Sequence, residues 1–144
     1  MGTPLRYATF DPASGNLGDG FNITRVTTTW LASENAWAAD QDITVQYSKI
    51  GHIVTMCIVQ TEHLSDTASV LQSPVGTIPE EFRPPRPQWI PLRVINGSAF
   101  QAGMGVCSID QTGKITVYEN GAAGTFSLAN NSGWDEFSHT YSVK

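Results

Sequence analysis

The chain has 144 residues, of which only 15% are charged, and its formal net charge is −5. This length fits one domain with a sizeable core, and the acidic balance argues against any partner with a nucleic-acid phosphate backbone. The longest apolar run is far shorter than the roughly 20 residues that span a bilayer, so no membrane insertion is expected. No basic and then apolar leader opens the chain, so no signal peptide is expected.

Residues 1–22 are rich in proline and glycine and predict short extended pieces, in a lead-in segment or linker. Residues 23–144 are predicted to form one head domain. The β-branched run at 23–30 predicts a strand. Residues 33–42 have some helical propensity but are few, so a loop with a single turn is expected there.

The stretch Tyr47 to Thr61 organises the prediction, because its second half is apolar at almost every position. Alternation along a strand places Ile53, Cys57 and Val59 on one face and Val54, Met56 and Ile58 on the other. Such a strand packs one face into its own core and offers the other to a neighbouring subunit. We assign Val54, Met56 and Ile58 to the subunit interface; the alternative is one chain whose own loops cover both faces.

The second half of the chain is predicted to contain more short strands and connecting turns. Residues 61–72 are polar and predict a long loop, and residues 73–91 hold six of the eight prolines, which excludes a central strand. Strands are then expected at 92–95, 104–109, 114–118, 125–128 and 137–143. Tight turns at 96–97 and 110–113 separate several of them. The fold class is therefore all-β, as an antiparallel β-sandwich or jelly roll.

The run Phe82-Arg83-Pro84 lies within the proline-rich region. The proline holds Arg83 extended, while Phe82 can fill the end of the core. A packed connection is therefore favoured here over a binding motif.

The two cysteines, Cys57 and Cys107, each lie in an apolar run that predicts a strand. Reduced, buried thiols are the favoured interpretation, and a disulfide would need facing strands of matching geometry. Neither cysteine belongs to a Cys-x-x-Cys motif, so a zinc or redox site is not expected.

Four short features occur in a characteristic order between residues 43 and 144. YSKIGHIVT (47–55) precedes IPEEFRPPRP (78–87), which is followed by GVCSIDQTGKITVY (105–118) and the closing GWDEFSHTYSV (133–143). In this order the chain resembles the distal head domain of a viral fibre, of the bacteriophage tail-fibre or adenovirus type. The choice between a phage and an animal virus stays open.

The resemblance implies a trimeric head: a homotrimeric β-sandwich that binds a host-cell surface receptor, either a glycan or a protein. It also implies a location at the fibre tip on the virion surface, after synthesis in the host cytoplasm. Recognition in such a fold falls on loops or outer sheet faces, since the inner faces are used for packing. Large aromatic residues predict the contacts, and we select Trp37, Phe100 and Trp89 as receptor-binding candidates.

Catalytic chemistry is not predicted, because the polar residues do not converge in sequence. The three histidines are scattered without metal-ligand spacing, and the adjacent Glu80 and Glu81 would point to opposite faces of a strand. No nucleophile elbow or phosphate loop is present. We therefore expect no enzyme activity, no metal and no cofactor.

Two other function classes compete with the fibre head. A monomeric carbohydrate-binding module could stack a sugar on Trp37 or Trp89, and a trimeric head of the C1q or tumour-necrosis-factor type could share the sandwich. Mass in solution separates the module from both trimers.

Overall fold

The structure is a computed structural model that describes residues 10–11, 16–17, 23–128 and 130–144. These residues form strands and two short 3-10 turns, η1 (Ala32–Glu34) and η2 (Glu80–Phe82), and no α-helix. None of the described elements is a helix of the length and apolarity that crossing a membrane requires. Most of the predicted lead-in segment, 1–22, lies outside the described residues, although β1 (Phe10–Asp11) and β2 (Asn16–Leu17) pair with each other.

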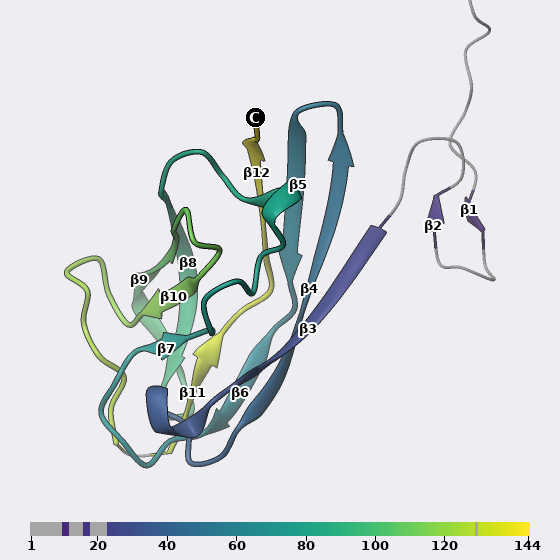
Figure 1. Cartoon of the computed structure of the whole chain (residues 1–144). Coiled ribbons are helices and arrows are strands. Elements are labelled where there is room, and N and C mark those ends of the chain that lie inside the picture. Colours follow the sequence, from purple (N-terminus) through teal and green to yellow (C-terminus); the bar gives the residue numbers. More distant parts are fainter. Residues whose placement is uncertain (1–9, 12–15, 18–22, 129) are drawn as a thin grey trace, which may run out of the picture.

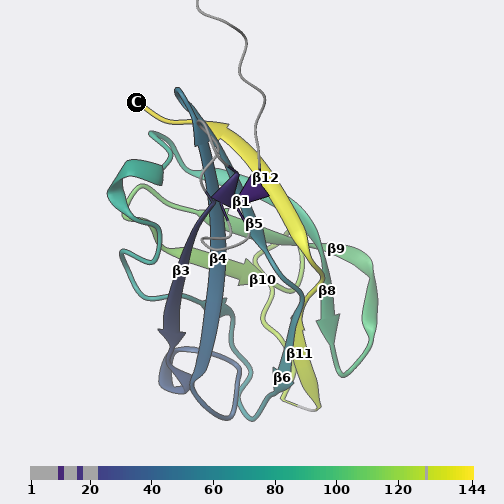
Figure 2. The same cartoon turned by 90° about the vertical axis from the view of Figure 1, so that its right-hand side faces the viewer.

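Two antiparallel sheets pack face to face, so the predicted β-sandwich is confirmed (Figures 1 and 2). The four-stranded sheet has the order β12-β5-β4-β3, with bounds Phe137–Ser142, Ile53–Ile58, Gln41–Ile50 and Ile23–Trp30. The six-stranded sheet has the order β6-β11-β8-β9-β10-β7, with bounds Thr61–Leu64, Asn131–Trp134, Gln88–Asn96, Phe100–Ile109, Ile115–Tyr118 and Leu71–Gln72.

Alternation in β4 matches its sequence pattern. Ile43, Val45 and Tyr47 are buried, whereas the polar residues between them are only partly covered. Gly51, at φ 59°, helps to reverse the chain between β4 and β5, a backbone conformation in which glycine avoids the strain of a Cβ atom. The hairpin predicted here is therefore confirmed.

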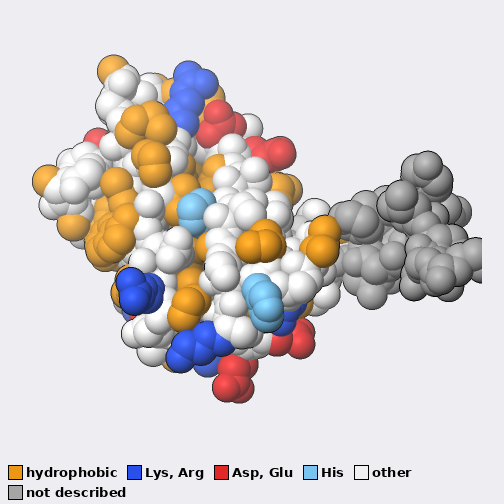
Figure 3. Space-filling view, turned by 90° about the horizontal axis from the view of Figure 1, so that it is seen from above, with side chains coloured by type: hydrophobic (Ala, Val, Ile, Leu, Met, Phe, Trp, Pro, Cys, Tyr) orange, Lys and Arg blue, Asp and Glu red, His pale blue; other side chains and the backbone are white. Residues whose placement is uncertain are grey.

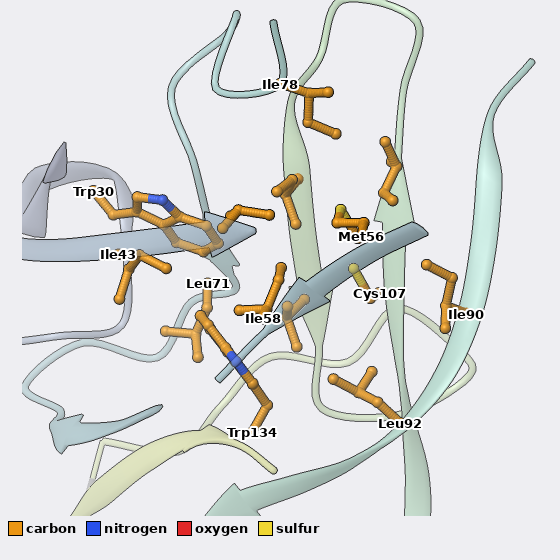
Figure 4. Packing of buried hydrophobic residues seen from close by; sticks show 14 of the residues in the cluster. Trp30, Ile43, Met56, Ile58, Leu71, Ile78, Ile90, Leu92, Cys107 and Trp134 are labelled. Carbon is orange, nitrogen blue, oxygen red and sulfur yellow. The ribbon is translucent and has the colours of Figure 1, made fainter. Parts of the chain in front are cut away.

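Three tryptophans from separate segments meet between the two sheets. Trp30 ends β3 and Trp134 ends β11, and their ring centroids are 5.3 Å apart, so this pair joins one sheet to the other. Trp37 packs against both, at 5.9 and 5.7 Å. All three side chains are fully buried, and Figure 4 shows Trp30 and Trp134 among the aliphatic core residues.

The predicted orientation of β5 is corrected by the structure. Val54, Met56 and Ile58 have no exposed surface within one chain, so they belong to its core and cannot contact another subunit. Ile53 and Thr55 on the opposite face are exposed. Both faces of β5 lack charge in the sequence, and alternation alone cannot say which of them meets the second sheet.

The proline-rich region also differs from its prediction, because β8 begins at Gln88 and continues through Pro91 inside the six-stranded sheet. Pro91 pairs with Val106 of β9 on one side. On the other side of β8, strand β11 pairs only with residues 94–96. Pro91 therefore lies where β8 is locally an edge, and its missing N–H costs no ladder hydrogen bond.

Two further segments exchange their predicted roles. Residues 61–72, predicted as a loop, contain β6 and β7, which pair with β11 and β10. Residues 125–128, predicted as a strand, join neither sheet. Their buried Phe126 explains the apolar signal, since its ring enters the core while its backbone N–H donates to the carbonyl of Ser69 at 2.8 Å.

The cysteines are free thiols, as predicted. Cys107 is fully buried, and burial raises the pKa of its thiol to about 12. Cys57 is half-buried on the outer face of the four-stranded sheet, and its pKa is raised by burial and secondarily by Glu136.

A core truncation tests the corrected orientation of β5. Met56→Ala should lower the free energy of unfolding by about 2–5 kcal/mol, because it leaves a cavity between the sheets. Val75→Ala removes methyl groups from a side chain that is 68% exposed and should change it by less than about 0.5 kcal/mol. Urea unfolding monitored by circular dichroism measures both, and equal effects would contradict the burial of Met56.

Candidate ligand-binding face

The outer face of the six-stranded sheet carries a group of exposed apolar and aromatic side chains. Along β8, Ile90, Leu92 and Val94 point into the core, and the residues between them point outward. The outward set continues on β9 and β10. We call it the aromatic face, and it consists of Trp89, Pro91, Arg93, Phe100, Met104, Val106 and Tyr118.

The strand register makes this face continuous. Pro91 of β8 lies opposite Val106 of β9, which lies opposite Tyr118 of β10. The rings of Trp89 and Tyr118 lean toward each other from the two flanking strands, with centroids 6.2 Å apart and planes inclined by 20°. Two nearly parallel aromatic rings therefore stand side by side on an otherwise open surface.

One cation is held within the face. The Arg93 guanidinium carbon lies 3.8 Å from the ring centroid of Phe100, within the range of a cation–π interaction. An Arg93 Nη1 atom is also 3.9 Å from Oδ2 of Asp135, whose backbone N–H donates to the Arg93 carbonyl at 2.9 Å. The contacts with Phe100 and with the Asp135 carboxylate orient the guanidinium, which places a hydrogen-bond donor next to the rings.

Several large side chains of the aromatic face are largely exposed to solvent. Trp89 is 62% exposed, Met104 is 54% and Phe100 is 39%. Single exposed hydrophobic residues are ordinary, but a contiguous group of tryptophan, tyrosine, methionine and arginine has the composition of a binding surface. Figure 3 shows hydrophobic side chains gathered on the side of the molecule where Figure 1 places the six-stranded sheet.

The structure brings two of the three predicted receptor contacts together and removes the third. Trp89 and Phe100 both belong to the aromatic face. Trp37 is fully buried, and its indole N–H donates to the carbonyl of Ser132 at 3.0 Å, so the prediction for Trp37 is wrong. Its small neighbours suggested a projecting loop, whereas they let the chain pass closely over the core while the ring inserts.

Sequence reasoning missed Arg93, Met104 and Tyr118 as members of the face. A signal was available, because QWIPLRV alternates between large apolar residues and a set that includes tryptophan and arginine. Extending that alternation across the two following strands requires their register, and the sequence alone does not supply it.

Acid–base groups do not converge among the described residues. No three His, Cys, Asp or Glu side chains in this part of the chain lie close enough to hold a metal ion. Burial lowers the pKa of His63, against a smaller opposing effect of Glu62, and burial also lowers the pKa of His139. The chemistry that the aromatic face offers is therefore stacking, apolar contact and hydrogen bonding from one cation.

Comparison with known proteins relates the chain to viral structural proteins. No protein-family model matches it. Structural protein V8 of Sputnik virophage is 27% identical over 126 residues, which are 85% of this chain and 68% of that protein. The reovirus attachment protein sigma1, solved in complex with α-2,3-sialyllactose, is similar in structure with a TM-score of 0.52 and 14% identity, over 99% of this chain and 79% of that chain.

These similarities support the predicted resemblance in a coarser form. The chain is similar in sequence to a viral structural protein and shares its fold with a viral attachment protein. Neither protein is a phage tail fibre or an adenovirus fibre, so those two specific families are not supported.

Tryptophan fluorescence tests the placement of the four indoles. Only Trp89 is exposed, whereas Trp30, Trp37 and Trp134 are fully buried. Iodide should quench one component of the native emission, and Trp89→Phe should abolish that component. The matched variant Trp37→Phe should retain the quenched component. If Trp37→Phe abolishes that component and Trp89→Phe retains it, Trp37 is the exposed indole.

Proposed function

We propose that the chain is the head of a virion fibre and attaches the virus to a host-cell surface receptor without catalysing a reaction. The observation that carries the proposal is the aromatic face, a group of exposed aromatic side chains on a fold shared with a viral attachment protein. The sequence similarity to a virion structural protein supports a place on the virion.

A glycan is the receptor class that suits this face best. The apolar faces of sugar rings stack on flat aromatic surfaces, and Trp89 and Tyr118 present two such surfaces in nearly parallel planes. The Arg93 guanidinium can donate hydrogen bonds to sugar hydroxyl or carboxylate oxygens. The similarity to a protein solved with a bound sialyllactose supports the same class.

Assembly into a homotrimer would multiply a weak site. Three symmetric copies that bind one cell surface raise the overall affinity through effective concentration. With Val54, Met56 and Ile58 in the core, the outer face of β4, β5 and β12 is the surface that we assign to subunit contact. We call it the Ser/Thr face, and it consists of Thr44, Gln46, Ser48, Ile53, Thr55, Cys57, Ser138, Thr140 and Ser142.

The composition of the Ser/Thr face supports this assignment. It contains no charged side chain; Arg25 and Asp42 lie at its border with β3, and Glu136 lies at its other border, near Cys57. An outer sheet face exposed to water normally carries several charges. The hydroxyl groups of Thr55 and Thr140 already bond to each other at 3.0 Å across the two strands. A hydroxyl-lined face without charge can pack against a second copy without burying an unpaired charge.

Binding to cells that the virus infects tests the attachment site. Trp89→Ala should weaken binding by about thirtyfold, equivalent to roughly 2 kcal/mol, and Phe100→Ala should weaken it less. Val75→Ala removes an equally exposed apolar group outside the face and should bind like the parent. Each variant is first checked for parental mass and secondary structure. If both aromatic variants bind cells as tightly as the parent, the aromatic face is not the attachment site.

Sedimentation equilibrium tests the assembly. The parent should give three times the mass of the 15.6 kDa chain, and Thr55→Asp should give the single-chain mass with its secondary structure intact. An introduced carboxylate would be buried without a partner if the Ser/Thr face is a subunit interface, and that costs several kcal/mol. Val75→Asp is the control. A parent that sediments as a monomer would support a monomeric binding module instead.

A further inference from the structure

A cavity of about 370 Å³ lies at the end of the sandwich opposite the three tryptophans. Its lining comes from Lys49 at the end of β4, residues of the segment 80–85, Gln111 in the β9–β10 turn, and Val143 and Lys144 after β12. These elements meet at the top of Figure 1, beside the chain end marked C. The volume lies within the range of small-molecule sites.

The wall of the cavity is fixed by packing beneath it. Phe82 is buried, and its ring stacks on Tyr47 with centroids 4.8 Å apart and planes inclined by 6°. The Tyr141 hydroxyl donates to the Phe82 carbonyl at 2.7 Å. Phe82 therefore anchors the segment 80–85 to β4 through its ring and to β12 through its backbone carbonyl, so a ligand meets a preformed wall.

A second set of contacts fixes the side of the cavity near the β9–β10 turn. Arg83 donates from Nε to the Ile78 carbonyl at 2.8 Å, and Gln111 donates to the Pro85 carbonyl. Gly113 passes so close that an added Cβ would lie 2.5 Å from the Ile78 oxygen. This close approach, together with a φ of 79°, requires glycine at that position.

Charged groups gather in the cavity without pairing to one another. The chain has eight Lys and Arg against 13 Asp and Glu, yet Lys49, Arg83 and Lys144 all line this one site. Among the described residues, the one ion pair is that of Arg93 and Asp135, which lies on the aromatic face. Lys49 donates to the backbone carbonyl of Glu81 at 3.1 Å rather than to a carboxylate. Figure 3, which looks onto this end, shows charged side chains of both signs on it.

The mixture of charges restricts the kind of ligand. Guanidinium and ammonium groups bind a carboxylate through charge-assisted hydrogen bonds. Glu80 and Glu81 would repel a strongly charged phosphate or sulfate polymer, but their oxygens accept hydrogen bonds from hydroxyl groups. Pro84, Pro85 and Val143 supply apolar wall. A small hydroxylated molecule with a single carboxylate satisfies all three sets of groups.

We infer that this cavity is a second binding site, separate from the aromatic face, for a sugar unit that carries one carboxylate. Lys49, Arg83 and Lys144 hold the carboxylate, and Glu80, Glu81 and Gln111 hold hydroxyl groups. The site does not depend on the aromatic face, because the two surfaces share no residue.

Ligand-observed NMR by saturation transfer tests the site on the intact chain. The probes are glucuronic acid and N-acetylneuraminic acid, each compared with a neutral counterpart, glucose and N-acetylmannosamine. At least one acidic sugar should bind about tenfold more tightly than its neutral counterpart. The difference should shrink when NaCl is raised from about 0.05 to about 0.5 M.

Variants that remove a positive or a negative charge from the cavity distinguish binding in the cavity from attraction to the charge of the whole protein. The double variant Lys49→Gln with Lys144→Gln should weaken binding of the acidic sugar about tenfold, and Glu80→Gln should strengthen it about threefold. Arg86→Gln removes an exposed cation just outside the lining and should change binding less than about twofold. In a Trp89→Ala background, which removes stacking on the aromatic face, the double lysine variant should still lose about tenfold, because the cavity lining does not include Trp89.

Two results would overturn the inference. One is equal binding of acidic and neutral sugars by the parent chain. The other is an equal loss of binding in Arg86→Gln and in the double lysine variant, because that would show a diffuse electrostatic effect. Circular dichroism of each variant confirms that a loss of binding is not a loss of fold.

Discussion

The packing of Trp30 against Trp134 is the contact on which the sandwich depends. These two rings come from the ends of β3 and β11, one in each sheet, and the buried Trp37 fills the space beside both. Large aromatic side chains contribute more buried apolar area than any other residue type, so three of them at one end hold the sheets together there. At the other end, the ring of Phe82 from η2 stacks on Tyr47 of β4 and covers the end of the core.

Closure at both ends leaves the two outer sheet faces for interaction, and these faces differ in chemistry. The six-stranded sheet presents exposed aromatic rings and an arginine, which is the composition of a recognition surface. Over β5 and β12 the four-stranded sheet presents hydroxyl groups without charge, a composition that permits close contact with another copy. One fold can therefore separate ligand binding from assembly, and a change in one face need not disturb the other.

The end cavity follows from the same constraint. Phe82 is drawn into the core beside Tyr47, and this pulls the charged residues on either side of it to the rim of the sandwich. Glu81 and Arg83 flank this core residue in the sequence, so the packing of Phe82 sets the position of their backbone. The segment 80–85 thus contributes both a core side chain, Phe82, and charged side chains that line the cavity.

Local sequence patterns were sufficient to predict the all-β class, the hairpin at Gly51, the free thiols, the core position of Phe82 and the exposure of Trp89 and Phe100. Each of these depends on alternation, turn chemistry or composition, which are properties of neighbouring residues. The folded chain was needed to show that Val54, Met56 and Ile58 face the core, that Trp37 is buried, and that Lys49, Arg83 and Lys144 line one cavity. Those facts depend on which sheet covers which face and on the register of strands distant in sequence, and a pattern with a period of two is the same for either face.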